Sequence, residues 1–113
     1  MANNFKTFTA QSIDTSSTKA TLYTCPSSPS TETTIIGLNI ANILTVSITV
    51  TVELLDGGST ITHIVKDAIV PVGSSLVVVG GDQKIVMNST DVLKVYGSEA
   101  NCCDAVLSVL EIT

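Results

Sequence analysis

Residues 44–54 alternate between apolar and polar side chains without interruption. Threonine, serine and glutamate separate the apolar positions, which are Leu44, Val46, Ile48, Val50, Val52 and Leu54. Because successive side chains of a strand point to opposite faces, a period of two gives one apolar face and one polar face. β-branched residues, which dominate the run, are also among the weaker helix formers. The pattern predicts one half-buried antiparallel strand over the whole of 44–54.

Shorter strand patterns flank this run, and turn residues separate them. The predicted strands span 20–24, 33–41, 60–66, 76–79, 84–88, 92–96 and 105–112. Asp56-Gly57-Gly58 is a hairpin signal, and the run 76–79, apolar on both faces, predicts a strand inside the packed sheets. We find no convincing helical period of 3.6. Eight or nine strands at intervals of about 8–12 residues indicate an all-β fold, a single antiparallel β-sandwich or jelly-roll-like domain.

The N-terminal residues differ from the rest because Asn, Gln, Thr and Ser dominate them. We predict that residues 1–19 form an N-terminal arm and that residues 20–113 form the β-sandwich domain. Phe5 and Phe8 stand three positions apart, so they lie on opposite faces if the arm is extended. They are candidates for docking onto a neighbouring subunit. The alternative is that the arm pairs at the edge of its own sheet.

Two further aromatic residues, Tyr23 and Tyr96, complete the candidate interface set. Tyr96 stands near the end of its predicted strand, where an edge aromatic covering the core is an equal alternative. The chain has no tryptophan. Carbohydrate-binding sandwiches normally present Trp or Tyr platforms, so a sugar-binding role is a weaker alternative.

Charge limits the classes of partner. The 113 residues, enough for one domain, carry a formal net charge of −5, and only 13% of them are charged. The five lysines are scattered and there is no arginine, whereas nucleic-acid binding needs clustered basic groups. A neutral polar surface suits packing against other proteins, although a threonine-rich strand surface gives the same composition. We also find no signal-peptide pattern and no apolar stretch near the ~20 residues of a membrane span.

The sequence offers little chemistry. Cys25, Cys102 and Cys103 have no zinc or redox spacing, which favours free thiols in a reducing compartment. A link from Cys25 to Cys102 or Cys103 stays open. His63 has no nearby triad partners in the sequence. We therefore predict no catalytic residue, no cofactor and no enzymatic activity.

Three aspartates, Asp56, Asp82 and Asp91, fall in predicted turns. Loops collect at the two ends of a sandwich, so these carboxylates have the chemistry for a calcium ion. Aspartate is also common in turns because its side chain caps the backbone of the turn. We favour the capping role and predict no metal site.

Five segments carry a family resemblance. They are 36–42 (IGLNIAN), 71–76 (PVGSSL), 81–87 (GDQKIVM), 91–95 (DVLKV) and 105–112 (AVLSVLEI). Taken together, this chain resembles small virion structural proteins of tailed bacteriophages, particularly those of marine cyanobacterial hosts, over about residues 20–113. The resemblance implies a β-sandwich subunit that is added in many copies to a capsid or tail, and it brings no catalytic residues.

The function expected from this resemblance is a capsid decoration or cement subunit, assembled in the host cytoplasm and located on the virion. Its partners would be the major capsid protein and further copies of itself, bridged through sheet edges and the N-terminal arm. The alternative partners are tail or neck proteins, in a ring or a fibre-docking subunit. A carbohydrate-binding β-sandwich is a further alternative, and an enzyme using His63 with turn carboxylates is the least favoured.

Overall fold

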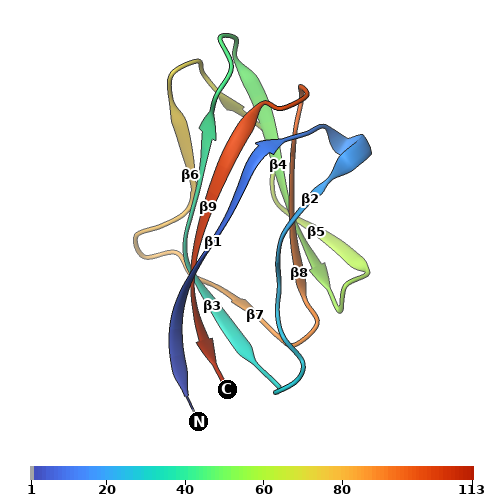
Figure 1. Cartoon of the computed structure of the whole chain (residues 1–113), viewed down its shortest axis with the longest axis vertical. Coiled ribbons are helices and arrows are strands. Elements are labelled where there is room, and N and C mark those ends of the chain that lie inside the picture. The colour runs from blue at the N-terminus through green and yellow to red at the C-terminus, as the bar shows by residue number, and fades with distance from the viewer. Residues whose placement is uncertain (1) are drawn as a thin grey trace.

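The computed structural model describes residues 2–113 as two antiparallel β-sheets packed face to face (Figure 1). The first sheet has the order β1 (Asn3–Ile13), β9 (Cys103–Ile112), β3 (Glu32–Asn42) and β6 (Ser75–Val79), with β7 (Ile85–Met87) also paired to β3. The second sheet has the order β2 (Ala20–Thr24), β8 (Val92–Gly97), β4 (Ile48–Asp56) and β5 (Thr60–Val70). A three-residue 3-10 helix, η1 (Ser16–Thr18), joins β1 to β2. The chain passes repeatedly from one sheet to the other, and the resulting strand order is that of a jelly roll. The predicted all-β sandwich is confirmed.

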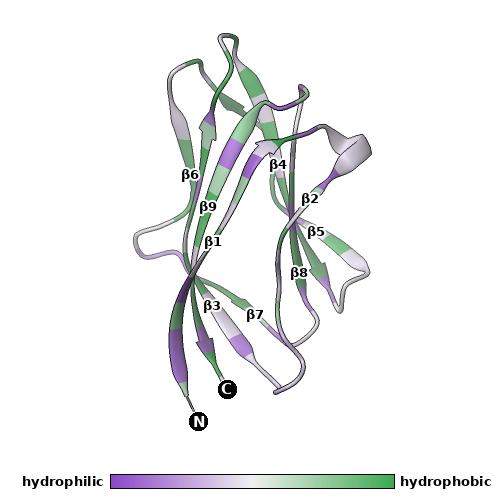
Figure 2. Cartoon of the chain, in the orientation of Figure 1, coloured by the Kyte–Doolittle hydropathy of each residue, from purple (hydrophilic) through white to green (hydrophobic). Residues whose placement is uncertain are grey.

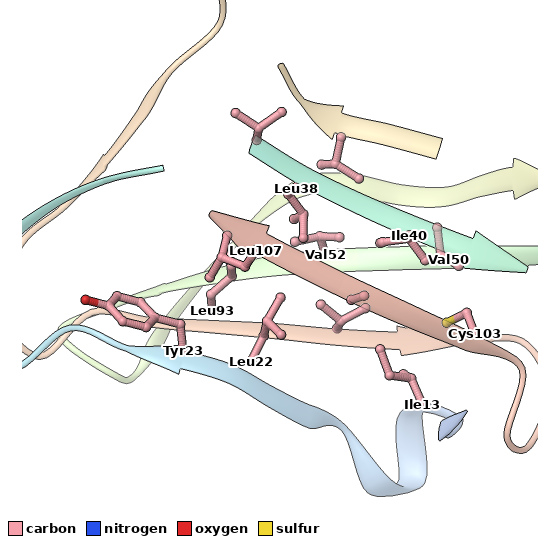
Figure 3. Packing of buried hydrophobic residues seen from close by; sticks show 14 of the residues in the cluster. Ile13, Leu22, Tyr23, Leu38, Ile40, Val50, Val52, Leu93, Cys103 and Leu107 are labelled. Carbon is pink, nitrogen blue, oxygen red and sulfur yellow. The ribbon is translucent and has the colours of Figure 1, made fainter. Parts of the chain in front are cut away.

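The core lies between the inner faces of the two sheets. Leu107 of β9 points toward Val52 and Leu93 of the other sheet, and all three side chains are fully buried (Figure 3). β9 is hydrophobic along most of its length, with hydrophilic positions near both ends (Figure 2). Because β9 lies between β1 and β3, it has a hydrogen-bonded strand on each edge, and its inner face packs against the second sheet.

The predicted strand over 44–54 is wrong at its start, because β4 begins at Ile48. The Asn42 side chain explains this difference. Its amide nitrogen donates to the carbonyl oxygens of Val46 (2.8 Å) and Val70 (3.0 Å), and its oxygen accepts from the Leu44 backbone nitrogen (2.8 Å). These bonds fold residues 43–47 into a loop against the end of β5, which the alternation could not indicate.

The second face of β4 also differs from the prediction. Val50 and Val52 face the core as expected, but Thr51, Glu53 and Leu55 on the opposite face are buried as well. Thr51 accepts a hydrogen bond from the Asp67 backbone nitrogen at 3.1 Å. The alternating polar residues therefore predicted the outer face of β4 correctly, but that face is not exposed to solvent.

Strand β6 is an edge strand of the first sheet, not the interior strand that its apolar sequence predicted. Val78 and Val79 are buried, whereas Val77 is exposed on the outer face. A run that is apolar on both faces can equally reflect one face in the core and one face on an unpartnered surface.

The N-terminal segment is part of the sandwich. Residues Asn3 to Ala10 pair one to one with β9 from Ile112 back to Ala105, so the predicted boundary between an arm and a domain at residue 19 is wrong. The alternative, pairing at the edge of its own sheet, is what the structure shows. Ala2 and Thr113 exchange two backbone hydrogen bonds (3.0 and 2.9 Å), which places the two termini side by side (Figure 1).

We expect Val50→Asp to prevent folding, because the carboxylate would be buried in the core without a partner. An uncompensated buried charge costs roughly 3–5 kcal/mol, a large part of the ~5–15 kcal/mol that stabilises a typical domain. The matched control is Val46→Asp, the same change at an exposed position in the neighbouring loop. Circular dichroism during urea unfolding checks both variants, and equal midpoints would contradict the prediction.

Candidate functional site

Two of the four aromatic candidates belong to the core. Tyr23 is only 4% exposed, and its ring centroid lies 4.7 Å from that of the half-buried Phe8, with the rings tilted by 57°. The even-numbered residues of β1 face inward with Phe8, which explains this contact. Tyr23 is therefore not a surface contact residue, and the prediction is wrong for it. The half-buried Phe8 packs against the core from the inner face of β1.

The other two aromatic candidates lie on outer faces. Phe5 is the more exposed, at 76%, on the outer face of the first sheet. Tyr96 is half-buried on the outer face of the second sheet, where the Lys19 ammonium lies 5.4 Å from its ring centroid. This cation–π contact covers part of the ring. Phe5 is thus the candidate that the structure leaves open to a partner.

A buried carboxylate, Glu111, closes one end of the core. It accepts a 2.5 Å hydrogen bond from the Tyr23 hydroxyl and forms an ion pair with Lys6 Nζ at 2.9 Å. The Tyr23 hydroxyl also bonds Thr33 Oγ1 at 2.8 Å. Burial alone would raise the pKa of Glu111, but the bonds from Tyr23 and Lys6 outweigh it and lower the pKa. Burial, followed by the bond to Glu111, raises the pKa of Tyr23, so the hydroxyl stays protonated and donates to Glu111.

A second buried carboxylate, Glu53, lies on the outer face of the second sheet. Its two oxygens contact Lys19 Nζ at 3.0 Å and His63 Nε2 at 3.3 Å, and its side chain is 3% exposed. Lys19 follows η1 and His63 belongs to β5. The cluster therefore ties the β1–β2 connection and β5 to the central strand β4.

The turn aspartates divide into one buried group and two exposed groups. Asp91 is buried, and its carboxylate accepts hydrogen bonds from the backbone nitrogens of Asn88 (3.0 Å) and Gly57 (2.9 Å). It thereby caps its own turn and joins it to the β4–β5 hairpin, which is the capping role expected from the sequence. Asp56 and Asp82 are exposed.

All three cysteines are free and buried. Cys25 lies near Thr33, and Cys103 lies opposite Asn42, nine positions further along β3. That spacing corresponds to about 30 Å, so the alternative that the sequence left open, a link from Cys25 to Cys103 or to the adjacent Cys102, is excluded. Cys102 precedes β9, and its Sγ lies 3.6 Å from that of Cys103, so these neighbours do not face opposite ways as a strand pair would. Burial raises the pKa of Cys25 and of Cys103.

Within residues 2–113 the structure encloses no pocket, and no three His, Cys, Asp or Glu side chains group as metal ligands. No helical segment of this part of the chain is long and apolar enough to cross a membrane.

The most distinctive exterior feature is a set of large hydrophobic side chains on the outer face of the first sheet, which we call the outer apolar face. Its exposed members are Phe5 (76%), Val77 (64%), Val86 (58%) and Val106 (45%). The strand register arranges them in two rows. One row runs from Phe5 through Leu110 and Thr34 to Val86.

The second row of the outer apolar face runs from Val106 through Asn39 to Val77. Thr34 and Asn39 separate the apolar members within these rows, and four large exposed hydrophobic side chains still share one sheet face. Several exposed apolar side chains on one face are typical of a surface that binds another protein. Of this surface, the sequence analysis identified only Phe5. The available signal was that 76–79 and 105–112 are apolar at both odd and even positions, which is more than one buried face requires.

No protein-family model matches this chain, and no curated protein matches it. A solved structure described as "Bacillus endospore appendages form a novel family of disulfide-linked pili" contains a chain of similar fold. The two chains are 19% identical, with a TM-score of 0.58 over 98% of this chain and 88% of that chain. At this level of identity the similarity concerns the fold, and it agrees with the β-sandwich described above.

We predict that the stability of this protein falls as the pH drops below about 4. The pKa of Glu111 is lower in the folded state than in the unfolded state. Its contribution is therefore complete above the unfolded pKa and is lost as the pH falls through the folded one. Glu111→Gln should lower stability at neutral pH by about 1.5–3 kcal/mol, the range for hydrogen bonds to a charged group.

Thermal unfolding from pH 7 to pH 2.5 measures this effect. The melting temperature of Glu111→Gln should change less with acid than that of the wild type. The control is Glu32→Gln, a change at an exposed position on the adjacent strand β3, and its melting temperature should vary with pH like that of the wild type. If Glu111→Gln also follows the wild-type curve, Glu111 does not carry the acid sensitivity.

Proposed function

We propose that this chain is a non-enzymatic structural subunit that functions in many copies and binds its assembly through the outer apolar face. The observation that carries this proposal is that four large hydrophobic side chains, those of the outer apolar face, are exposed on one face of a packed sandwich. Exposing these apolar side chains to water is unfavourable, and a partner that covers them gains about 25 cal/mol of free energy per Å² of apolar area buried. Many modest contacts of this kind add together when the subunit is repeated.

The assembly that we propose first is a virion, with the chain as a capsid decoration subunit on the major capsid protein. The resemblance of 36–42, 71–76, 81–87, 91–95 and 105–112 to phage virion proteins supports this placement. The sparse charge of the chain supports it too, because a neutral surface is desolvated at low cost. Assembly in a host cytoplasm is compatible with three reduced thiols. A neck or tail ring is the alternative position on the same particle.

The second candidate is a repeating subunit of an extracellular filament. The supporting observation is the fold shared with the chain described as part of disulfide-linked pili. A head-to-tail contact between unlike surfaces repeats without closing and produces such a filament. Because Cys25, Cys102 and Cys103 are buried, we propose that any such filament of this chain is held by non-covalent contacts.

Electron microscopy and light scattering of the purified protein distinguish these candidates. A filament subunit forms long assemblies alone, and a reducing agent leaves them intact if the contacts are non-covalent. A decoration subunit stays a small oligomer until capsids of its phage are added. A protein that forms neither assembly and binds no particle would contradict the proposed function.

A double variant, Val77→Lys with Val86→Lys, tests the surface itself. Both side chains are exposed on the outer apolar face, so the fold should persist while incorporation into particles or filaments falls about tenfold or more. Ile61→Lys is the matched control, because Ile61 is an exposed aliphatic residue on β5 of the other sheet. Quantitative electrophoresis of purified particles measures incorporation. Equal losses for the control and the double variant would rule out a specific face.

A further inference from the structure

The outer edge of β1 is open along its whole regular length. β1 ends the strand order of the first sheet, so it has β9 on one side and no hydrogen-bonded strand on the other. In Figure 1 the N-terminal half of β1 runs beside β9 with no strand on its opposite side. Residues 3–10 pair with β9 without a register shift, and the irregularity comes only between Ala10 and Ile13.

The register identifies which backbone groups are free. Ala2 and Thr113 exchange both of their hydrogen bonds, so they form a hydrogen-bonded pair of the antiparallel ladder. Such pairs recur at every second residue, which assigns the even-numbered residues of β1 to bonds with β9. The N–H and C=O groups of Asn3, Phe5, Thr7 and Thr9 therefore point away from the sheet. They form a continuous row of donors and acceptors that an extended strand can bind.

This edge has few of the features that normally prevent strands from pairing. None of the four residues that present free backbone groups is charged. The one charged residue among 3–10 is Lys6, and its ammonium is held by the buried Glu111 at 2.9 Å instead of guarding the edge. There is no proline or positive-φ residue within residues 3–10. Proteins usually protect a long exposed edge with a charge, a proline or a bulge.

The other open edges are protected. β7, which borders β3 beside β6, has only three residues. β2 and β6 have five residues each, and each contains a register shift. β5 is long, but its pairing with β4 shifts twice, and Asp67 adopts a positive φ of 51° beside Lys66. β1 also has a register shift and a positive φ at Ser12, but both lie beyond Ala10, so the eight residues 3–10 form the longest regular open edge of the described residues.

We propose that the outer edge of β1 pairs antiparallel with the same edge of a second copy of this chain. The proposal rests on the proposed function, because it names one of the contacts that a multi-copy subunit uses. It joins the two five-stranded first sheets into one continuous sheet with a two-fold axis between the β1 strands. The two outer apolar faces then lie on the same side of that sheet, because a two-fold axis normal to the sheet keeps the faces in place.

A second copy suits this edge better than a strand of unrelated sequence. A two-fold contact centred on Thr7 places the outward-facing residues Phe5, Thr7 and Thr9 opposite one another, and they are neutral, so no like charges oppose each other on the outer face. On the inner face, Lys6 then lies opposite Phe8 of the other copy and not opposite itself. Phe5, the most exposed large hydrophobic side chain of the part of the chain that the structure describes, gains a cross-strand neighbour from the other copy. The same edge serves both partners, which closes the contact as a dimer.

Thr7→Pro tests the proposal. Proline at this position removes an N–H that points away from β9, so it removes no hydrogen bond within the subunit, and edge strands tolerate such prolines. We expect the dimer dissociation constant to rise tenfold or more, as measured by sedimentation equilibrium over a dilution series. Thr7→Val, which keeps the N–H, is the matched control and should dimerise like the wild type. A wild-type protein that is monomeric throughout, or a Thr7→Pro protein that dimerises equally well, would overturn the proposal.

Amide hydrogen exchange of the wild type gives an independent readout that does not depend on a variant that folds. In the dimer the amides of Phe5, Thr7 and Thr9 should be protected, and dilution should expose them while the even-numbered amides stay protected by β9. Fast exchange at the odd positions in a dimeric sample would place the contact elsewhere and overturn the proposal.

The Val77→Lys, Val86→Lys protein separates this proposal from the proposed function. It should dimerise normally, because neither residue lies on β1, while its incorporation into larger assemblies falls. Loss of its dimer would place the contact on the outer apolar face and overturn pairing through β1. If Thr7→Pro dimerises like the wild type while assemblies still form, pairing through β1 fails and the structural role stands.

Discussion

The apolar contact between the inner faces of the two sheets is the constraint on which the rest of this structure depends. It buries Val52 and Leu93 of one sheet against Leu107 of the other, and it fixes which residues of every strand face outward. Because side chains alternate along a strand, a register fixed on the inside also fixes the outside. The outer apolar face and the outward row of backbone groups on β1 both follow from that register.

Buried carboxylates add a second level of organisation. Glu111 joins β9 to β1 through Lys6 and to β2 through Tyr23, whereas Glu53 joins β4 to β5 through His63 and to the residue after η1 through Lys19. A buried charge is tolerated only when partners satisfy it, so these contacts hold edge strands at defined positions. In β1 the one charged residue among 3–10, Lys6, makes one of these pairs on the inner face, and the residues on its outer face are uncharged.

The aromatic residues show how far sequence reasoning about the site could reach. Phe5 and Phe8 were predicted to lie on opposite faces, and they do, because the period of a strand is a local property. Which of the two faced solvent depended on β9 and Tyr23, which are distant in the sequence, and Tyr23 itself proved to be a core residue. Val77, Val86 and Val106 were not recognised as surface, since an apolar side chain gives no local sign of the face that it occupies. The buried positions of Glu53 and Glu111 were missed because the partners that satisfy these carboxylates are distant in the sequence.

The sequence by itself determined that this chain consists of short strands joined by turns, and it located β2, β3, β8 and most of β9 to within a few residues. Those properties depend on side-chain alternation and on turn residues such as Gly57 and Gly58, which act over a few positions. Only the tertiary structure decided that residues 3–13 are an edge strand, that β4 starts at Ile48, and that two carboxylates are buried. These features arise from contacts between residues tens of positions apart, such as Lys6 with Glu111 and Asn42 with Val70. A local pattern does not encode such contacts, because they exist only after the two sheets have packed.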